Sequence, residues 1–493
     1  MTVNPNPKKM RPYDAPPRRR RSLIPRGPDS AATGFFVAAA LWLAAATGLG
    51  TLAIGLRMVD FEFSLGLGVF DLSLTVDARR VDYAFVNATV YGWLTNAGFA
   101  AIIFMTSRLL GRRIAMDAAA FGGLVIWNLA LAGGLGALYI FDLGSNAPLT
   151  AFPWLIDGGL ATAALLVTGA VLLTAGTALR TAYVSLWFAA VGLLALVGLL
   201  GLSALIGLLD FVIGFDELVL ALVSAFIDRG IVVLWLLGAA YATLHYVVPR
   251  ATGQPLASSG TAMLTFLAWL VLAPVATLAV LVDPAIPFFL TSAGVVATIL
   301  LLVPAALAVT NLAQTMHGRW TLVFGPGTAA FAVVALAFLF AATLLESIGA
   351  LRAVDGFLGR TEWTRGVFLW AAFGTFSFAA FAIAEHAVPR ILRRAWGGGL
   401  LSGAQLWLAF GGVTVAGLAL MGGGLAEGSL LAQGTPPDEI ASGVIGYQAV
   451  AFAGLGMVAL AGVALVLNLF LMYTSGRPAD YTVPGNAAVA TGH

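Results

Sequence analysis

Twelve long apolar segments follow one another along this chain of 493 residues. They begin near residues 33, 84, 117, 152, 180, 219, 259, 286, 322, 366, 400 and 445. Each is long enough to cross a bilayer, which takes about 20 mostly apolar residues. Only 10% of the residues are charged, well below the roughly 25% of soluble domains. A soluble fold is excluded, and we expect an all-α integral membrane protein of about twelve transmembrane helices.

Charged residues divide unevenly between alternate connections. One set collects arginines, namely Arg108, Arg112, Arg113, Arg180, Arg250, Arg319, Arg390, Arg393, Arg394 and Arg477, whereas the other set is rich in Asp and Glu. Cytoplasmic loops of membrane proteins are enriched in Lys and Arg, so both termini are predicted to be cytoplasmic. We expect a flexible basic tail over 1–32, a membrane domain over 33–474 and a short tail over 475–493. The basic run in the first tail is interpreted as a topology signal that also touches lipid headgroups, rather than as a nucleic-acid site.

Three of the spans resemble one another in sequence. The second reads YGWLTNAGFAAIIFMTSR, the sixth VLWLLGAAYATLHYVVPR and the tenth FGTFSFAAFAIAEHAVPR, and they close on Arg108, Arg250 and Arg390. The spacings between these arginines are 142 and 140 residues, and each spacing covers four spans. The pattern therefore predicts three arcs of four helices, with chance similarity of small-residue helices as the alternative.

Four segments resemble subunit I of the haem-copper oxidases, and the cbb3-type branch above all. They are RRVDYAFVNATVYGWLTNAGFA, DRGIVVLWLLGAAYATLHYVVPRATGQPL, MLTFLAWLVLAPVATLAVLVD and RTEWTRGVFLWAAFGTFSFAAFAIAEHAVPR. The resemblance implies the twelve-helix fold of that subunit, a bacterial-type inner membrane and a place in a respiratory chain. It also implies where the metal ligands of the family would fall.

Those ligand positions carry no histidine here. The family's haem-ligand positions fall on Phe85, Val367 and Leu369, and its copper-ligand positions fall on Arg229, Val275 and Ala276. Haem iron and copper need nitrogen, sulfur or phenolate donors, and the chain has no cysteine and only four histidines. We therefore predict no haem, no metal and no oxidase catalysis in this chain, with haem only in a partner subunit.

Ionisable residues inside the spans are the remaining candidates for a site, because such residues are costly in a bilayer and usually paired or functional. Arg229 is predicted to fill the emptied copper site and to bond to a carboxylate on another span; the alternative is that it lies with Asp228 among the headgroups. Glu385 and His386 form a candidate proton relay, or merely a hydrated pair. His245 and His386 are either a displaced ligand pair or two interfacial polar residues. The full set of candidates is Asp157, Asp228, Arg229, Glu385 and His386.

Three functions are compatible with the sequence. The first is a non-catalytic scaffold or anchor subunit that contacts lipid and holds a partner such as a membrane-anchored c-type cytochrome. The second is a terminal oxidase or nitric oxide reductase with unorthodox haem ligands. The third is a proton or ion conduit that reuses the emptied pores.

Overall fold

The computed structural model describes residues 29–59, 62–66, 73–141, 147–282, 286–396 and 399–478. This part of the chain is helical apart from one antiparallel hairpin, formed by β1 (Phe63–Gly66) and β2 (Ser73–Val76). Most of the two predicted tails lies outside the described residues. The first helix already begins at Ser30, so the start of the membrane domain lies slightly before the predicted boundary.

Twelve helices within the described ranges are long and apolar enough to cross a membrane, which confirms the expected number. Several are built from two or three consecutive pieces. In chain order the spans are α1 (Ser30–Val59); α2 (Ala78–Asn87), η1 (Ala88–Thr95) and α3 (Asn96–Leu110); α4 (Asp117–Ala137); α5 (Trp154–Ala175); α6 (Val184–Ile213); α7 (Glu217–Gly230), η4 (Ile231–Leu236) and α8 (Leu237–Thr252); α9 (Ser259–Ala276) and η5 (Thr277–Val280); α10 (Phe288–Leu300) and α11 (Leu302–Thr315); α12 (Thr328–Gly349); α14 (Glu362–Leu369), η7 (Trp370–Phe376) and α15 (Ser377–Leu392); α16 (Gly399–Ala432); and α17 (Pro437–Ser475). Short helices η2 (Pro148–Thr150), η3 (Gly176–Thr181), η6 (Trp320–Val323) and α13 (Arg352–Leu358) lie between or at the ends of spans.

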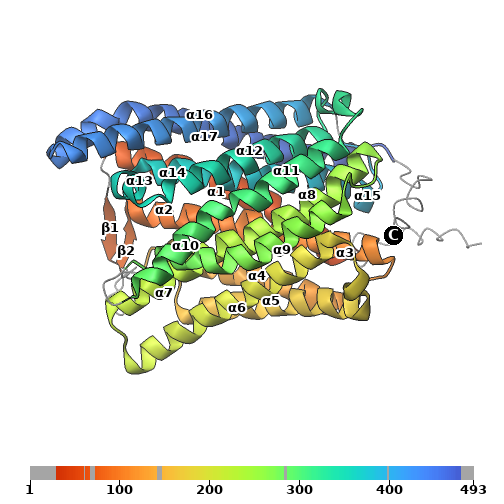
Figure 1. Ribbon diagram of the computed structural model, residues 1–493, viewed down its shortest axis with the longest axis horizontal. Helices are drawn as coiled ribbons and strands as arrows, with labels where there is room; N and C mark the ends of the chain where they lie inside the picture. The colour runs from red at the N-terminus through yellow and green to blue at the C-terminus, as the bar shows by residue number, and fades with distance from the viewer. Residues whose placement is uncertain are drawn as a thin grey trace, which may run out of the picture.

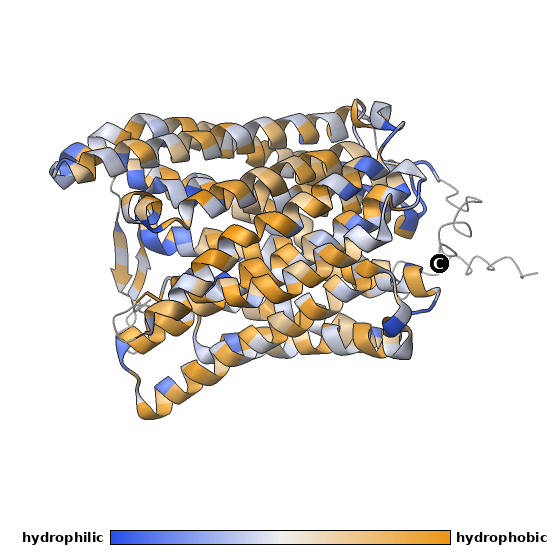
Figure 2. Cartoon of the chain, in the orientation of Figure 1, coloured by the Kyte–Doolittle hydropathy of each residue, from blue (hydrophilic) through white to orange (hydrophobic). Residues whose placement is uncertain are grey.

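The helices run side by side along one axis, with hydrophobic residues over the length of the bundle and hydrophilic residues gathered toward its two ends (Figures 1 and 2). The last two helices are longer than a bilayer requires. At 1.5 Å per residue, α16 and α17 are about 50 and 58 Å long, whereas the hydrocarbon core is about 30 Å thick. Their hairpin projects at the end of the bundle where β1 and β2 lie (Figure 1), which we call the outer end.

The second, sixth and tenth spans share an unusual feature, because each contains a π-helical segment in its middle (η1, η4 and η7). Side chains at repeat-related positions join these segments. Trp235 donates its indole N–H to Thr95 Oγ1 at 2.9 Å, and Trp93 donates to Ser377 Oγ at 2.7 Å. The two hydroxyls each donate to the carbonyl five residues earlier, and both of these carbonyls belong to π-helical segments. This common geometry confirms the three-arc repeat.

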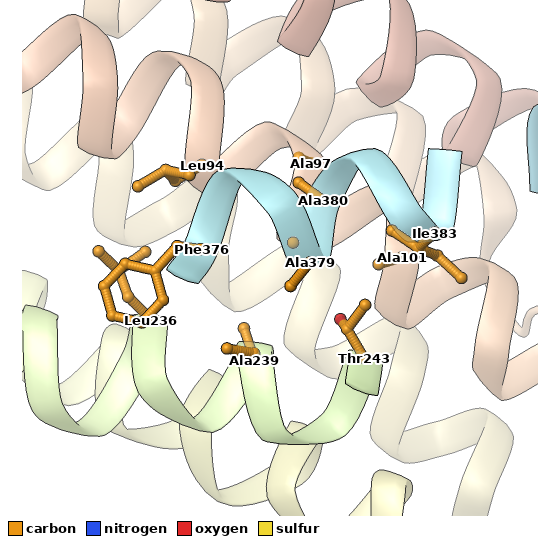
Figure 3. A pocket seen from close by; sticks show the side chains of 12 residues that line it. Leu94, Ala97, Ala101, Leu236, Ala239, Thr243, Phe376, Ala379, Ala380 and Ile383 are labelled. Carbon is orange, nitrogen blue, oxygen red and sulfur yellow. The ribbon is translucent and has the colours of Figure 1, made fainter. Parts of the chain in front are cut away.

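The three related spans meet around a small cavity of about 20 Å³ in the middle of the bundle (Figure 3). Its lining comes from four positions of each repeat, and most of these residues are small. They are Leu94, Ala97, Gly98 and Ala101 from the first arc; Leu236, Ala239, Ala240 and Thr243 from the second; and Phe376, Ala379, Ala380 and Ile383 from the third. Small side chains let membrane helices approach closely, so the three arcs close around this central contact.

Candidate functional site

The second span carries Phe85, the residue at one predicted haem-ligand position. Its ring stacks on Phe373 with the ring centres 6.0 Å apart and the planes 4° from parallel. Gly50 on α1 makes room for the ring, since a Cβ atom there would lie 2.6 Å from it. Leu369, at a second haem-ligand position, is buried one turn before Phe373. Hydrocarbon side chains therefore pack this part of the bundle.

A cavity of about 440 Å³ lies between α7, η5, α10, α12, α13 and α14 at the outer end. It brings together Arg229, at a predicted copper-ligand position, and Val367, at the remaining predicted haem-ligand position. The two residues, which belong to the sixth and tenth spans, thus lie on the walls of one cavity.

Arg229 forms an ion pair across this cavity with Glu346 of α12, Nη1 to Oε1. Its Nη2 also lies 3.4 Å from Thr298 Oγ1 on α10. The arginine side chain is 15% exposed and the glutamate 40%. The expectation that Arg229 bonds to a carboxylate on another span is confirmed. Helix α7 begins at Glu217, so Arg229 lies about 18 Å along it.

The seventh span reaches the cavity through residues that follow the two predicted copper-ligand positions. Val275 and Ala276 do not line the cavity; Ala279 and Val280, one turn further along, do. The α-helix of this span ends at Ala276 and continues as a 3-10 segment over Thr277–Val280, and this tighter winding changes which side chains face inward. Both pairs of residues are hydrocarbons, and the assignment of copper-ligand positions to Val275 and Ala276 stays a prediction.

The side chains at these positions do not fit the metal groups of the haem-copper family. Phe85, Val367 and Leu369 have no atom that can ligate iron, and the Arg229 guanidinium is a permanent cation that repels a copper ion. Across the ranges that the structure describes, no three or more His, Asp or Glu side chains are grouped to hold a metal ion. No reaction step through haem or copper can be derived from this donor set.

Asp157 and Asp228 are buried near the outer end, where they accept hydrogen bonds from different neighbours. Ser203 Oγ donates to Asp157 at 2.5 Å, and the Leu149 backbone N–H donates to Asp228 at 3.2 Å. Each carboxylate has a second buried oxygen without a hydrogen-bond partner in the described part of the chain. Asp228 thus accepts a hydrogen bond from the backbone before α5, whereas Arg229 forms its ion pair with Glu346 and not with the neighbouring Asp228.

Glu385 and His386 point to different helices. Ser402 of α16 donates to Glu385 Oε1 at 2.9 Å, whereas the His386 ring packs edge-on against Phe104 and Tyr246, with centres 6.2 and 6.0 Å away. Neighbours on a helix point about 100° apart, and here each has its own partners. The predicted proton relay between these two residues is not assembled.

His245 occupies a separate aromatic cluster. Its ring stacks on Phe188 at 5.5 Å, and its Nδ1 is 2.8 Å from the Tyr241 carbonyl. His386 contacts other rings, as described above, so the structure does not bring the two histidines together as ligands. Both rings are buried within the protein.

Four charged residues at the outer end form a ring that the sequence did not predict. Arg57 pairs with Asp82 at 2.7 Å and Arg365 with Glu362 at 2.8 Å, and the two pairs are joined by contacts of 3.6 Å. The ring ties α1, α2 and α14 together. The sequence did contain a sign of this ring. Arg57 and Arg365 lie in connections that are otherwise rich in Asp and Glu, so acidic partners for them could have been expected.

Comparison with known proteins agrees with this architecture. The family model described as "Cytochrome C and Quinol oxidase polypeptide I" matches residues 30–457. The chain is 26% identical over 186 residues to the cbb3-type cytochrome c oxidase subunit CcoN1 of Stutzerimonas stutzeri, a match that covers 38% of this chain and 39% of that protein. A solved heme-copper terminal oxidase dimer shares its fold, with a TM-score of 0.76 at 15% identity over 95% of this chain and 89% of the other. The chain is therefore a multi-pass membrane protein that belongs to the cytochrome c and quinol oxidase polypeptide I family.

Proposed function

We propose that this chain is a haem-free and copper-free member of its family that serves as a scaffold subunit of a respiratory membrane complex. One observation carries the proposal, namely the Arg229–Glu346 ion pair, whose arginine occupies a copper-ligand position implied by the family resemblance. The pair places a fixed positive charge where a copper ligand would stand. A cation site cannot coexist with a guanidinium that is already hydrogen-bonded in it.

The packing around Phe85 supports the same proposal. A pore that has lost a large planar group leaves a cavity unless side chains fill it, and unfilled volume is costly. Here the stacked rings of Phe85 and Phe373 fill it, with Gly50 accommodating the first ring. The cavity beside Arg229 is open, but its wall carries the Arg229–Glu346 ion pair, further charged residues and hydrocarbons, and no histidine.

The partner in this proposal is a membrane-anchored c-type cytochrome. The named relative is a subunit of a cbb3-type cytochrome c oxidase, a protein that works in a complex with other redox subunits. The projecting α16–α17 hairpin and the β1–β2 hairpin supply an outer surface for such a partner (Figure 1). The complex would lie in a bacterial inner membrane, with both ends of this chain in the cytoplasm.

The proposal is tested by co-purification with staining for covalently bound haem. Tagged protein is extracted from native membranes in mild detergent, together with two variants of α16. Leu431→Glu changes an exposed residue at the outer tip, and Leu400→Glu changes one at the opposite end of the same helix. We expect a haem-stained partner with the native chain and with Leu400→Glu, and its loss with Leu431→Glu. A chain that carries haem itself, or that purifies without any haem-stained partner, would refute the scaffold role.

A further inference from the structure

The cavity beside Arg229 is large and mostly apolar. Its volume is about 440 Å³. Much of the wall is hydrocarbon, including Val280, Val295, Leu345 and Val367. Water is stable in a cavity only where two or more polar groups hold each molecule, so these walls favour an apolar occupant.

Exposed apolar residues lie at the mouth of the cavity. Val282 belongs to the lining and is 75% exposed, and Phe288 close by is 69% exposed. On a membrane protein, large exposed apolar residues of this kind face acyl chains. A lipid tail can therefore reach the interior from the side of the bundle without crossing water.

The same mouth carries two exposed charges of opposite sign on the short helix α13. Arg352 donates to Ser292 Oγ at 2.9 Å and to Thr291 Oγ1 at 3.3 Å, and its guanidinium lies 3.9 Å from the centre of the Phe288 ring. In the part of the chain that the structure describes, no carboxylate lies within ion-pair distance of Arg352. Asp355, one turn later, also lines the cavity. An anion is thus complementary to Arg352, and a cation one helical turn away is complementary to Asp355.

We propose that this cavity binds a zwitterionic aminophospholipid. One acyl chain fills the space along Val295, Leu345 and Val367, the phosphate pairs with Arg352 and the ammonium group pairs with Asp355. Arginine held over an aromatic ring is a preferred partner of phosphate. The Arg229–Glu346 pair closes the inner end, because its two charges already satisfy each other. This lipid site is additional to the scaffold function.

Two variants test binding of the acyl chain and binding of the headgroup independently. Gly356 lines the cavity, and a Cβ atom there meets nothing within 4 Å, so Gly356→Leu adds a bulky apolar side chain at a position that has room for its Cβ. Gly201 on α6 is equally open but lies elsewhere, and Gly201→Leu is its control. Arg352→Gln removes the phosphate partner, with Arg79→Gln as the control, because Arg79 is also exposed and lies over a tyrosine ring.

The measurement is native mass spectrometry of the full chain, purified in detergent and then given phosphatidylethanolamine or phosphatidylglycerol. We expect one retained phosphatidylethanolamine and at least fivefold weaker retention of phosphatidylglycerol. Gly356→Leu should lose the lipid and Arg352→Gln should bind it about fivefold more weakly, whereas both control variants should behave as the native chain. Equal retention of the two lipids, retention by Gly356→Leu, a free fatty acid or porphyrin mass in its place, or no retained lipid would each overturn the proposal. Lipid retention needs no partner subunit, so a failure of the scaffold function would leave this result unchanged.

Discussion

Replacing either member of the Arg229–Glu346 pair should destabilise the protein, but by different amounts. Glu346 is 40% exposed, so in the Arg229→Leu variant water can solvate the remaining carboxylate, and we expect a loss of about 1 kcal/mol. Arg229 is only 15% exposed and its Nε has no hydrogen-bond partner within the described ranges. Glu346→Leu leaves that cation unpaired, at a cost of about 2–3 kcal/mol, below the 3–5 kcal/mol for a fully buried pair because Arg229 keeps some contact with water.

The double variant distinguishes a true pair from two independent residues. Replacing both charges by leucine removes the desolvation of each, so the loss should be under about 1 kcal/mol, far less than the sum of the single losses. Arg113→Leu, at an exposed position, serves as the control and should change stability by less than about 0.5 kcal/mol.

The assay is the free energy of unfolding in mixed micelles, from titration with sodium dodecyl sulfate followed by tryptophan fluorescence. The expected order of losses is Glu346→Leu, then Arg229→Leu, then the double variant. An Arg229→Leu variant with native stability, or a double variant that equals the sum of the two single variants, would refute the reasoning.

Three further predictions follow from the packing. Gly50→Ala should cost about 1–3 kcal/mol of unfolding free energy, because its Cβ would lie 2.6 Å from the Phe85 ring; Gly48→Ala on the same helix meets nothing within 4 Å and should be neutral in the same titration. Trp235→Phe removes a buried hydrogen bond between two repeats and should cost about 1 kcal/mol by that assay; a neutral result would show that this bond does not stabilise the arcs. Proteoliposomes containing the chain should stay tight to protons in a pH-sensitive dye assay, because Asp157 is engaged by Ser203; a leak abolished by Asp157→Asn would indicate a conduit instead.

Hydropathy was sufficient to predict twelve spans, because each apolar segment must bury its backbone in helix to cross a bilayer. It was less accurate where helices leave the membrane. Helix α17 begins at Pro437, well before the predicted start near 445, because its first turns are polar and only the apolar part of a helix gives a hydropathy signal. The repeat was visible from its closing arginines, whereas the π-helical segments and the bonds between them have no pattern in a single sequence.

The candidate site was predicted only in part, because its contacts join residues that are far apart in the sequence. That Arg229 needs a carboxylate partner follows from the cost of a buried charge, but Glu346 is 117 residues away and only the fold identifies it. The residues of the seventh span that line the cavity depend on the 3-10 turn after Ala276, which local sequence does not specify. Glu385 and His386 were a candidate proton relay because they are adjacent in sequence. In the fold their side chains contact different helices.

Haem and copper content per chain is the most direct test of the proposal that this family member has lost its metal chemistry. The purified chain, freed from partner subunits, is assayed by the pyridine haemochrome method and by elemental analysis against its protein concentration. Phe85, Leu369 and Arg229 at the predicted ligand positions lead us to expect less than about 0.05 haem and copper per chain, the level of contamination, because none of these side chains can ligate either metal. One haem or one copper bound per chain would contradict it.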